Sequence, residues 1–190
     1  MSVKDLDKKV LKIYYKTYFS NRGVILSTND FSLGRHVVLD ISADSDTKIG
    51  KRFVCEGYRN KNGAVCSKIA VQKGAHLTIG DNCKMINSVI WCSNEITIGD
   101  NVTISEDCLI MDTDFHSTDW RIRMRPDDCE HRRSKSIHIG NNVLIGRSCI
   151  IGKGIEIGDN SCVLSGSVVV KNIPEGETWG GNPAVKRQDK

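Results

Sequence analysis

The feature that most limits how this chain can fold is an aliphatic residue at every sixth position. From Ile139 the chain reads IGNNVL, IGRSCI, IGKGIE, IGDNSC, VLSGSV and VVKNIP, and Gly follows the first four of these aliphatic residues. The same register appears in IGDNVT, ISEDCL and IMDTDF from Ile98, and in IGDNCK and MINSVI from Ile79. Such an internal repeat is typical of a solenoid, in which each unit buries its apolar side chain against its neighbours.

The residue types between the aliphatic positions favour strands over helices. Gly and β-branched residues dominate, and Asn and Asp occupy the positions where the chain must turn. A second small or apolar residue follows four positions after each aliphatic one. Three short strands joined by such turns form a triangular coil of about 18 residues, and coils stack about 4.8 Å apart. The sequence therefore predicts an all-β solenoid, a parallel β-helix.

The repeats resemble those of the hexapeptide-repeat acyltransferases. The ending SGSVVVKNIPEGETWGGNPAVKR is similar to that family's ending, and the resemblance covers roughly residues 30–187. The segment DTDFH at residues 112–116 resembles the maltose and galactoside type of sugar O-acetyltransferase and relatives from polysaccharide clusters. The resemblance implies left-handed coils, which depart from the usual right-handed crossover. It also implies a homotrimer and acetyl-CoA as the co-substrate.

The pattern divides the chain into three parts. Residues 1–22 place Val3, Leu6, Val10, Ile13 and Tyr14 at helical spacing and predict an amphipathic helix. This helix could cap the open end of the solenoid, pack on a neighbouring subunit or lie on a membrane surface. Residues 23–174 form the β-helix, with a loop expected at 55–66, and residues 175–190 form a turn and a tail.

The repeat is interrupted at residues 112–136, which predict a loop that protrudes from the solenoid. This segment is polar and charged, and long loops on rigid scaffolds often carry function. Its arginines could favour an acidic acceptor, or they could pair within the loop with Asp127, Asp128 and Glu130. The arginines are Arg121, Arg123, Arg125, Arg132 and Arg133.

Composition excludes several classes of protein. The net charge of +4 is too small to indicate nucleic-acid binding, and no apolar run is long enough to span a membrane. The N-terminus has no signal-peptide core, so we expect a cytoplasmic protein. The eight cysteines include no CxxC pair, and several lie at repeat positions, as small buried hydrophobes would in a reducing cytosol. A disulfide framework is the alternative.

Acetyl transfer to a hydroxyl needs a base, a donor for the oxyanion and a groove for the coenzyme. Among five histidines, His116 lies where the loop leaves the coil, with acidic residues on both sides. Taken alone, such a histidine could be an ordinary surface residue. The resemblance implies that His116 is the general base of a direct transfer and that Asp114 is its partner.

Other site residues are also implied by the resemblance. Asn87 matches a residue that binds the acceptor sugar, although a corner Asn that supports a turn is the alternative. Trp179 could stack near the adenine or pack the last turn, and the basic residues could meet phosphates or remain solvated. The positions matching the coenzyme site are Asn141, Gly146, Ser165, Gly166, Lys171, Lys186 and Arg187.

Three alternatives share this scaffold. One is N-acetylation of an amino sugar nucleotide, and another is a β-helix that binds without catalysis. The third is a γ-class carbonic anhydrase, which needs three zinc histidines. His116, His131 and His138 would have to supply them, but their spacing does not match, so we expect no metal requirement.

Overall fold

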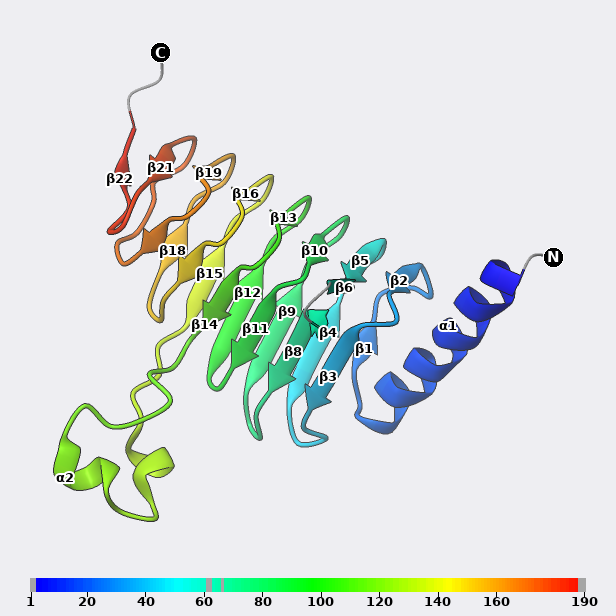
Figure 1. The fold of residues 1–190 in the computed structure, drawn as a ribbon, viewed down its shortest axis with the longest axis horizontal. Coiled ribbons are helices and arrows are strands. Elements are labelled where there is room, and N and C mark those ends of the chain that lie inside the picture. Colours follow the sequence, from blue (N-terminus) through cyan, green and yellow to red (C-terminus); the bar gives the residue numbers. More distant parts are fainter. Residues whose placement is uncertain (1–2, 61–62, 66, 188–190) are drawn as a thin grey trace.

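The chain forms a triangular solenoid of parallel strands with a helix at its N-terminal end (Figure 1). The computed structural model describes residues 3–60, 63–65 and 67–187. Sheet A contains, in spatial order, β1 (Ile25–Leu26), β4 (Asp46–Ile49), β9 (His76–Ile79), β12 (Glu95–Ile98), β15 (Ile137–Ile139) and β18 (Glu156–Ile157).

The other two faces of the prism are built in the same way. Sheet B contains β2 (Phe31–Leu33), β5 (Phe53–Glu56), β10 (Lys84–Ile86), β13 (Thr103–Ile104), β16 (Leu144–Ile145), β19 (Cys162–Val163), β21 (Thr178–Gly180) and β22 (Val185–Lys186). Sheet C contains β20 (Val168–Val169), β17 (Ile150–Ile151), β14 (Leu109–Met111), β11 (Val89–Cys92), β8 (Ser67–Val71) and β3 (Val37–Ile41).

The aliphatic residues of the repeat form the core, as the sequence predicts. Ile98, Ile139 and Ile157 are paired in register in sheet A, and each is at most 2% exposed. The small residues four positions later, such as Val143 and Cys149, are also buried. Each coil thus covers its apolar side chains with the coils above and below. The predicted fold, a left-handed parallel β-helix with an N-terminal helix, is confirmed.

The corner between sheets A and B explains the IGDN form of the repeat. A Cβ atom on Gly80 would lie 2.5 Å from the carbonyl oxygen of Gly99, so this position has room only for glycine. The Oδ1 atom of Asp100 accepts a hydrogen bond from the amide of Asp81 on the preceding coil, at 2.7 Å. A ladder of side-chain amides links the left-handed corner residues Asn82, Asn101, Asn142 and Asn160 at 2.9 Å per step.

The helix α1 (Val3–Asn21) covers the first coil by hydrogen bonding to the free edge of β3. The Tyr15 hydroxyl donates to the carbonyl oxygen of Gly34 at 2.9 Å. The Tyr18 hydroxyl donates to the carbonyl oxygen of Leu39 at 3.0 Å and accepts from the amide of Ile41 at 3.1 Å. These side chains satisfy backbone groups that another strand would otherwise pair.

The helix α1 is confirmed, but the prediction of which of its faces is buried is wrong. Val10, Ile13 and Tyr14 are 59%, 65% and 60% exposed, whereas Tyr15 and Phe19 are buried against the first coil. The helix has apolar residues on two sides. The side that packs on the first coil is the one whose tyrosines can hydrogen-bond to the backbone there.

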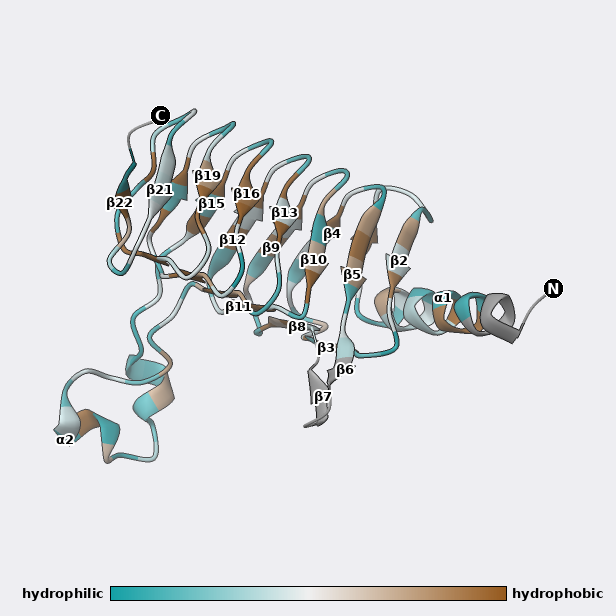
Figure 2. Ribbon diagram, turned by 45° about the horizontal axis from the view of Figure 1, so that its top comes forward, coloured by the Kyte–Doolittle hydropathy of each residue, from teal (hydrophilic) through white to brown (hydrophobic). Residues whose placement is uncertain are grey.

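Two segments leave the prism (Figure 2). The first lies within residues 55–66, where a loop was expected, and is an antiparallel hairpin of β6 (Tyr58–Asn60) and β7 (Gly63–Val65). The second is the excursion, residues 112–136, which contains the short helix α2 (Trp120–Arg123) and the 3-10 helix η1 (Asp128–His131). None of the helices in the described part of the chain is long and apolar enough to cross a bilayer.

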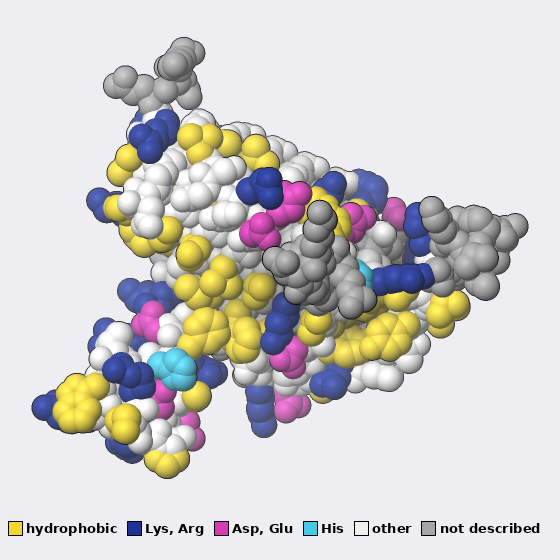
Figure 3. All heavy atoms as spheres, viewed as in Figure 1, with side chains coloured by type: hydrophobic (Ala, Val, Ile, Leu, Met, Phe, Trp, Pro, Cys, Tyr) yellow, Lys and Arg dark blue, Asp and Glu magenta, His cyan; other side chains and the backbone are white. Residues whose placement is uncertain are grey.

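The outer face of sheet C is apolar, unlike that of sheet A. Its central column has an aliphatic residue on five of its six strands, whereas the matching column of sheet A has a polar residue on five of its six strands. Figure 3 shows hydrophobic side chains gathered over this side of the molecule. The column consists of Val38, Lys68, Val89, Leu109, Ile150 and Val168.

The described cysteines are all free, and most of them fill the interior as small hydrophobes. Cys55, Cys83, Cys92, Cys108 and Cys149 are buried, Cys162 is half-buried and Cys129 in the excursion is exposed. Cys66 lies outside the described residues.

The corner glycine gives a first prediction. We expect Gly80→Ala to lower the free energy of unfolding by about 1–3 kcal/mol, because its Cβ would overlap the next coil. Gly152→Ala is the matched control, since its Cβ would meet the carbonyl oxygen of Val169 at an ordinary 3.7 Å. Urea denaturation followed by circular dichroism measures both. Equal losses for the two variants would contradict this account of the corner.

The tyrosine cap gives a second prediction. Tyr18→Phe leaves the carbonyl of Leu39 and the amide of Ile41 without their partner and should cost about 1–3 kcal/mol. Tyr14→Phe, on the exposed side of the same helix, should change stability by less than about 0.5 kcal/mol. The same denaturation experiment compares them, and a neutral Tyr18→Phe would show that the edge of β3 does not need these bonds.

Candidate active site

The excursion is closed at its base by backbone contacts between its two ends. Thr113 and Ser134 form an antiparallel bridge. The amide of Lys135 donates to the carbonyl oxygen of Asp112 at 2.9 Å, and the amide of Asp114 donates to that of Arg133 at 3.0 Å. The excursion is therefore joined to the solenoid through a narrow neck, which holds the residues that follow Asp112.

Asp112 anchors this neck to the preceding coil. Its side chain is fully buried and accepts hydrogen bonds from the amides of Ser93, Asn94 and Glu95, at 2.7, 2.7 and 2.9 Å. Burial raises the pKa of the Asp112 carboxyl, and the three amide hydrogen bonds oppose that change. Asp112 thus supports the corner rather than the chemistry above it.

The turn that presents His116 is set by Phe115. Its φ is +63°, a left-handed conformation that a bulky residue adopts only where its surroundings hold it. The Phe115 ring packs edge-on against Trp91 of β11, with ring centroids 5.0 Å apart. The amide of His116 then donates to the carbonyl oxygen of Asp114 at 2.7 Å, which closes the turn.

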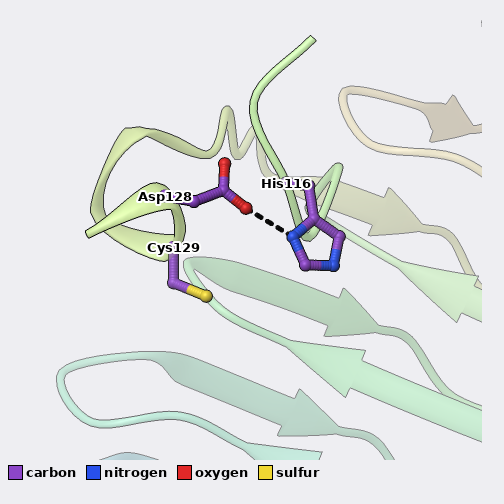
Figure 4. A group of neighbouring side chains, drawn as sticks. All are labelled: His116, Asp128 and Cys129. Atoms are coloured by element: carbon purple, nitrogen blue, oxygen red, sulfur yellow. Dashed lines mark hydrogen bonds and ion pairs between the residues drawn. The ribbon is translucent and has the colours of Figure 1, made fainter. Parts of the chain in front are cut away.

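His116 is paired with Asp128, from the other arm of the excursion (Figure 4). The Nδ1 atom of His116 lies 2.5 Å from Oδ2 of Asp128, and Oδ1 of Asp128 accepts from the amide of Ser117 at 2.8 Å. The Ser117 amide and the His116 ring hold the pKa of Asp128 below its usual value. An ionised Asp128 fixes the proton of His116 on Nδ1 and leaves Nε2 as a base.

The two side chains differ in their access to solvent. The His116 side chain is 61% exposed and that of Asp128 is 9% exposed. A buried carboxylate behind an exposed imidazole can orient the ring and stabilise its protonated form while a substrate approaches the other nitrogen.

Asp114, the partner expected from the sequence, is placed elsewhere. Its carboxylate pairs with the ammonium of Lys153, which follows β17, and both side chains are about one quarter exposed. Asp128 takes the position beside His116. Asp128 lies twelve residues after His116 in the same run of charges, where the sequence suggested pairing with arginines. The spacing carries no signal that would have singled it out.

Asn87 lies at the corner between sheets B and C, in a left-handed conformation with φ of +44°. Its Oδ1 accepts from the amide of Tyr58 at 2.7 Å, so the side chain supports the start of the β6–β7 hairpin. This is the structural alternative that the sequence left open. Its assignment to the acceptor stays a prediction.

The residues expected to bind the coenzyme are spread over three corners of the prism. Asn141 belongs to the corner between sheets A and B, where its Oδ1 accepts from the amide of Asp100 at 2.8 Å. Gly146, Ser165 and Gly166 lie between sheets B and C, and the Ser165 hydroxyl accepts from the amide of Arg147 at 3.1 Å. Lys171 is exposed at the corner between sheets C and A, the same corner as the excursion.

The last two predicted cations lie on the C-terminal hairpin of β21 and β22. Lys186 pairs with Glu177 at 2.6 Å, and Glu177 also accepts from the indole nitrogen of Trp179 at 2.7 Å. Lys186 and then Trp179 hold the pKa of Glu177 below its usual value. Arg187 is exposed, and its amide donates to the carbonyl oxygen of Thr178 at 2.8 Å. The role of these residues in coenzyme binding stays a prediction.

The three histidines of the carbonic anhydrase alternative are not brought together. His131 contacts Asp127 at 3.2 Å, and His138 lies on the outer face of β15 beside Glu156. Within the described residues, the group close enough to share a metal ion consists of His116, Asp128 and Cys129. Part of the arginine run pairs internally, since Arg125 binds Asp127 in a bidentate ion pair at 2.9 and 2.5 Å.

Comparison with known proteins agrees with the fold and the repeat. Residues 136–171 match the family model described as bacterial transferase hexapeptide (six repeats). A galactoside O-acetyltransferase from Escherichia coli (strain K12) is 36% identical over 111 residues, which cover 58% of this chain and 52% of that protein. The chain thus spans about half the length of the curated relatives that it matches.

Two solved structures extend the comparison. A galactoside acetyltransferase in complex with coenzyme A is 32% identical, with a TM-score of 0.50 over 60% of this chain and 55% of that one. An N-acyltransferase from Bacillus cereus, in complex with dTDP and 3-hydroxybutyryl-CoA, has a TM-score of 0.71 over 92% of this chain and 87% of that one. Its 14% identity bears on the fold alone.

The fold and the repeat define this chain as a hexapeptide-repeat left-handed β-helix. The relatives confirm the resemblance drawn from the sequence, which is to the hexapeptide-repeat acetyltransferases, with galactoside acetyltransferases among the matches.

The neck of the excursion gives a third prediction. Lys153→Met removes the partner of Asp114 and should speed amide hydrogen exchange at residues 113–117 by about 2- to 5-fold, because an ion pair that is partly exposed to solvent contributes up to about 1 kcal/mol. Lys171→Met is the control, since Lys171 is exposed one coil further on at the same corner. Mass spectrometry after deuteration measures both. Unchanged exchange in Lys153→Met would show that the pair does not hold the neck.

Proposed function

We propose that this protein is an acetyl-CoA-dependent O-acetyltransferase that acts on a hydroxyl of a sugar or glycan precursor. The observation that carries the proposal is the exposed His116 ring, whose Nδ1 is held by the buried Asp128 at 2.5 Å. Galactoside O-acetyltransferases among the relatives support the reaction type. The acceptor class, a cytoplasmic location and a role in polysaccharide assembly are parts of the same proposal.

The chemistry assigned to the residues is direct transfer. Acetyl-CoA supplies the acetyl group as a thioester. His116 accepts the proton of the acceptor hydroxyl on Nε2 while the hydroxyl oxygen attacks the acetyl carbon. Asp128 stays ionised and stabilises the imidazolium that forms. His116 then returns the proton to the departing thiolate, so the base is regenerated in each turnover.

The chain carries groups that suit a coenzyme with phosphates and a long pantetheine arm. Lys171 and Arg187 offer exposed cations, and Gly166, with φ of +74°, turns the backbone at the corner between sheets B and C. Exposed Leu164 and Val170 lie near these positions in sequence and could border the arm. These residues lie on different corners, so one groove would combine them across two copies of the chain.

We propose a homotrimer for the same reason. The aliphatic column on the outer face of sheet C is a contiguous apolar strip, and apolar strips on a surface are typical of contacts between subunits. Trp120 and Met124, at the tip of the excursion, are 59% and 80% exposed and could reach a neighbouring copy. A neighbour there would help to close the site around His116.

The proposal gives a fourth prediction, measured as release of the coenzyme thiol from acetyl-CoA with galactosides, maltose and an amino sugar nucleotide as acceptors. We expect His116→Ala to lower kcat by about 10²- to 10⁴-fold with little change in acetyl-CoA affinity. Asp128→Asn should lower kcat by at least about 10²-fold, because an amide favours the wrong tautomer of His116. His131→Ala, in the same excursion, is the matched control and should retain activity.

The competing results are distinct. Loss of acetyl-CoA affinity with retained turnover in His116→Ala would overturn the assignment of the base. Transfer to the amino group alone would replace O-acetylation with N-acetylation. Absence of saturable acetyl-CoA binding in calorimetry would overturn the proposed function as a whole.

A further inference from the structure

The pair formed by His116 and Asp128 has a third neighbour, the thiol of Cys129. One donor atom from each of the three residues lies within 4.8 Å of the other two, and Figure 4 shows the three side chains gathered at one place. His116 comes from the arm of the excursion that leaves the solenoid, whereas Asp128 and Cys129 lie together in η1 on the returning arm. The Asp114–Lys153 pair holds the first of these arms to the solenoid.

The donor set suits zinc. Imidazole nitrogen, carboxylate oxygen and thiolate sulfur bind zinc at about 2.0–2.3 Å, which puts the donors of a tetrahedral site about 3.3–3.8 Å apart. The present separations run from 2.5 Å, between Nδ1 of His116 and Oδ2 of Asp128, to at most 4.8 Å, so movements of about 1 Å reach that geometry. His116 and Cys129 are exposed, so an ion can enter and a water molecule can fill the fourth position.

We propose that His116, Asp128 and Cys129 form an inhibitory zinc site on the catalytic base. Zinc binds the nitrogen that faces Asp128, Nδ1 of His116, together with one Asp128 oxygen and the Cys129 thiolate. The thiol proton passes to solvent. A neutral imidazole has one N–H, so a metal on Nδ1 leaves the proton on Nε2. His116 then has no lone pair for the acceptor hydroxyl, and transfer stops.

This inference rests on the proposed function for its consequence, but the binding itself can be measured without activity. Cadmium is a spectroscopic substitute for zinc, because a thiolate bound to cadmium gives a charge-transfer band in the ultraviolet. Cys129 is the exposed member of the cysteines that the structure describes, and the half-buried Cys162 on β19 offers a matched control. Cys129 takes no part in the proposed transfer, so Cys129→Ser keeps the activity measured without metal.

The fifth prediction is the outcome of a cadmium titration of the whole chain, reduced and freed of metal. The wild type and Cys162→Ser should each show a saturable band equivalent to about one cadmium per chain. Cys129→Ser should lose the band, and His116→Ala should weaken cadmium binding by at least about 10-fold, since loss of a ligand costs at least as much as loss of its supporting shell. In the transfer assay, zinc should inhibit the wild type and Cys162→Ser, and Cys129→Ser should need at least about 10-fold more zinc.

Each contrary result removes a defined part of the proposal. A band that persists in Cys129→Ser, or no saturable binding in the wild type, would overturn the site. Equal zinc inhibition of the wild type and Cys129→Ser would overturn the inhibitory role. If the chain transferred no acetyl group at all, the cadmium titration would still decide whether the site exists.

Discussion

The stacking of successive coils, at the spacing of hydrogen-bonded strands, is the constraint on which the rest of the molecule depends. Because each coil lies directly over the previous one, a residue meets its own counterpart in the next coil, as Ile98 meets Ile139 and Ile139 meets Ile157. The same side chain must therefore fit against itself at every level. That requirement selects aliphatic residues inside, asparagine at the left-handed corner and glycine where Gly80 touches Gly99.

A solenoid of this kind has two open ends, and the chain closes them differently. At the first coil, Tyr15 and Tyr18 of α1 replace the missing strand with hydroxyl groups. At the last coil, β22 folds back antiparallel on β21, and Lys186 is tied to Glu177. The helix could be predicted from its spacing, but its buried face could not. Apolar residues line both sides of α1, and the hydrogen-bonding needs of β3 decide between them.

The sequence predicts the parts of the site that the repeat positions, and it does not predict the parts that depend on the fold of the excursion. The interruption of the period located the excursion, and the DTDFH segment pointed to His116. The partner of His116 depends on how an irregular loop of 25 residues folds back, and no period constrains that. Asp114 is adjacent in sequence but is drawn to Lys153 on the solenoid, whereas Asp128 returns to His116 from the far arm. Sequence distance was therefore a poor guide within the excursion.

The geometry that suits His116 to the proposed role of general base also suits it to bind a metal ion. A buried carboxylate aligned with Nδ1 favours the proton there, and the same carboxylate attracts a cation that displaces the proton. Cys129 adds a donor that catalysis does not need and thus favours zinc over the proton. The proton and the metal ion thus compete for the same atom, Nδ1 of His116. Both arms are fixed at the neck, through Lys153 to Asp114 and through the amide of Gly154 to the carbonyl oxygen of Lys135. The small movement that zinc requires therefore falls on side chains beyond the neck and not on the coil stack.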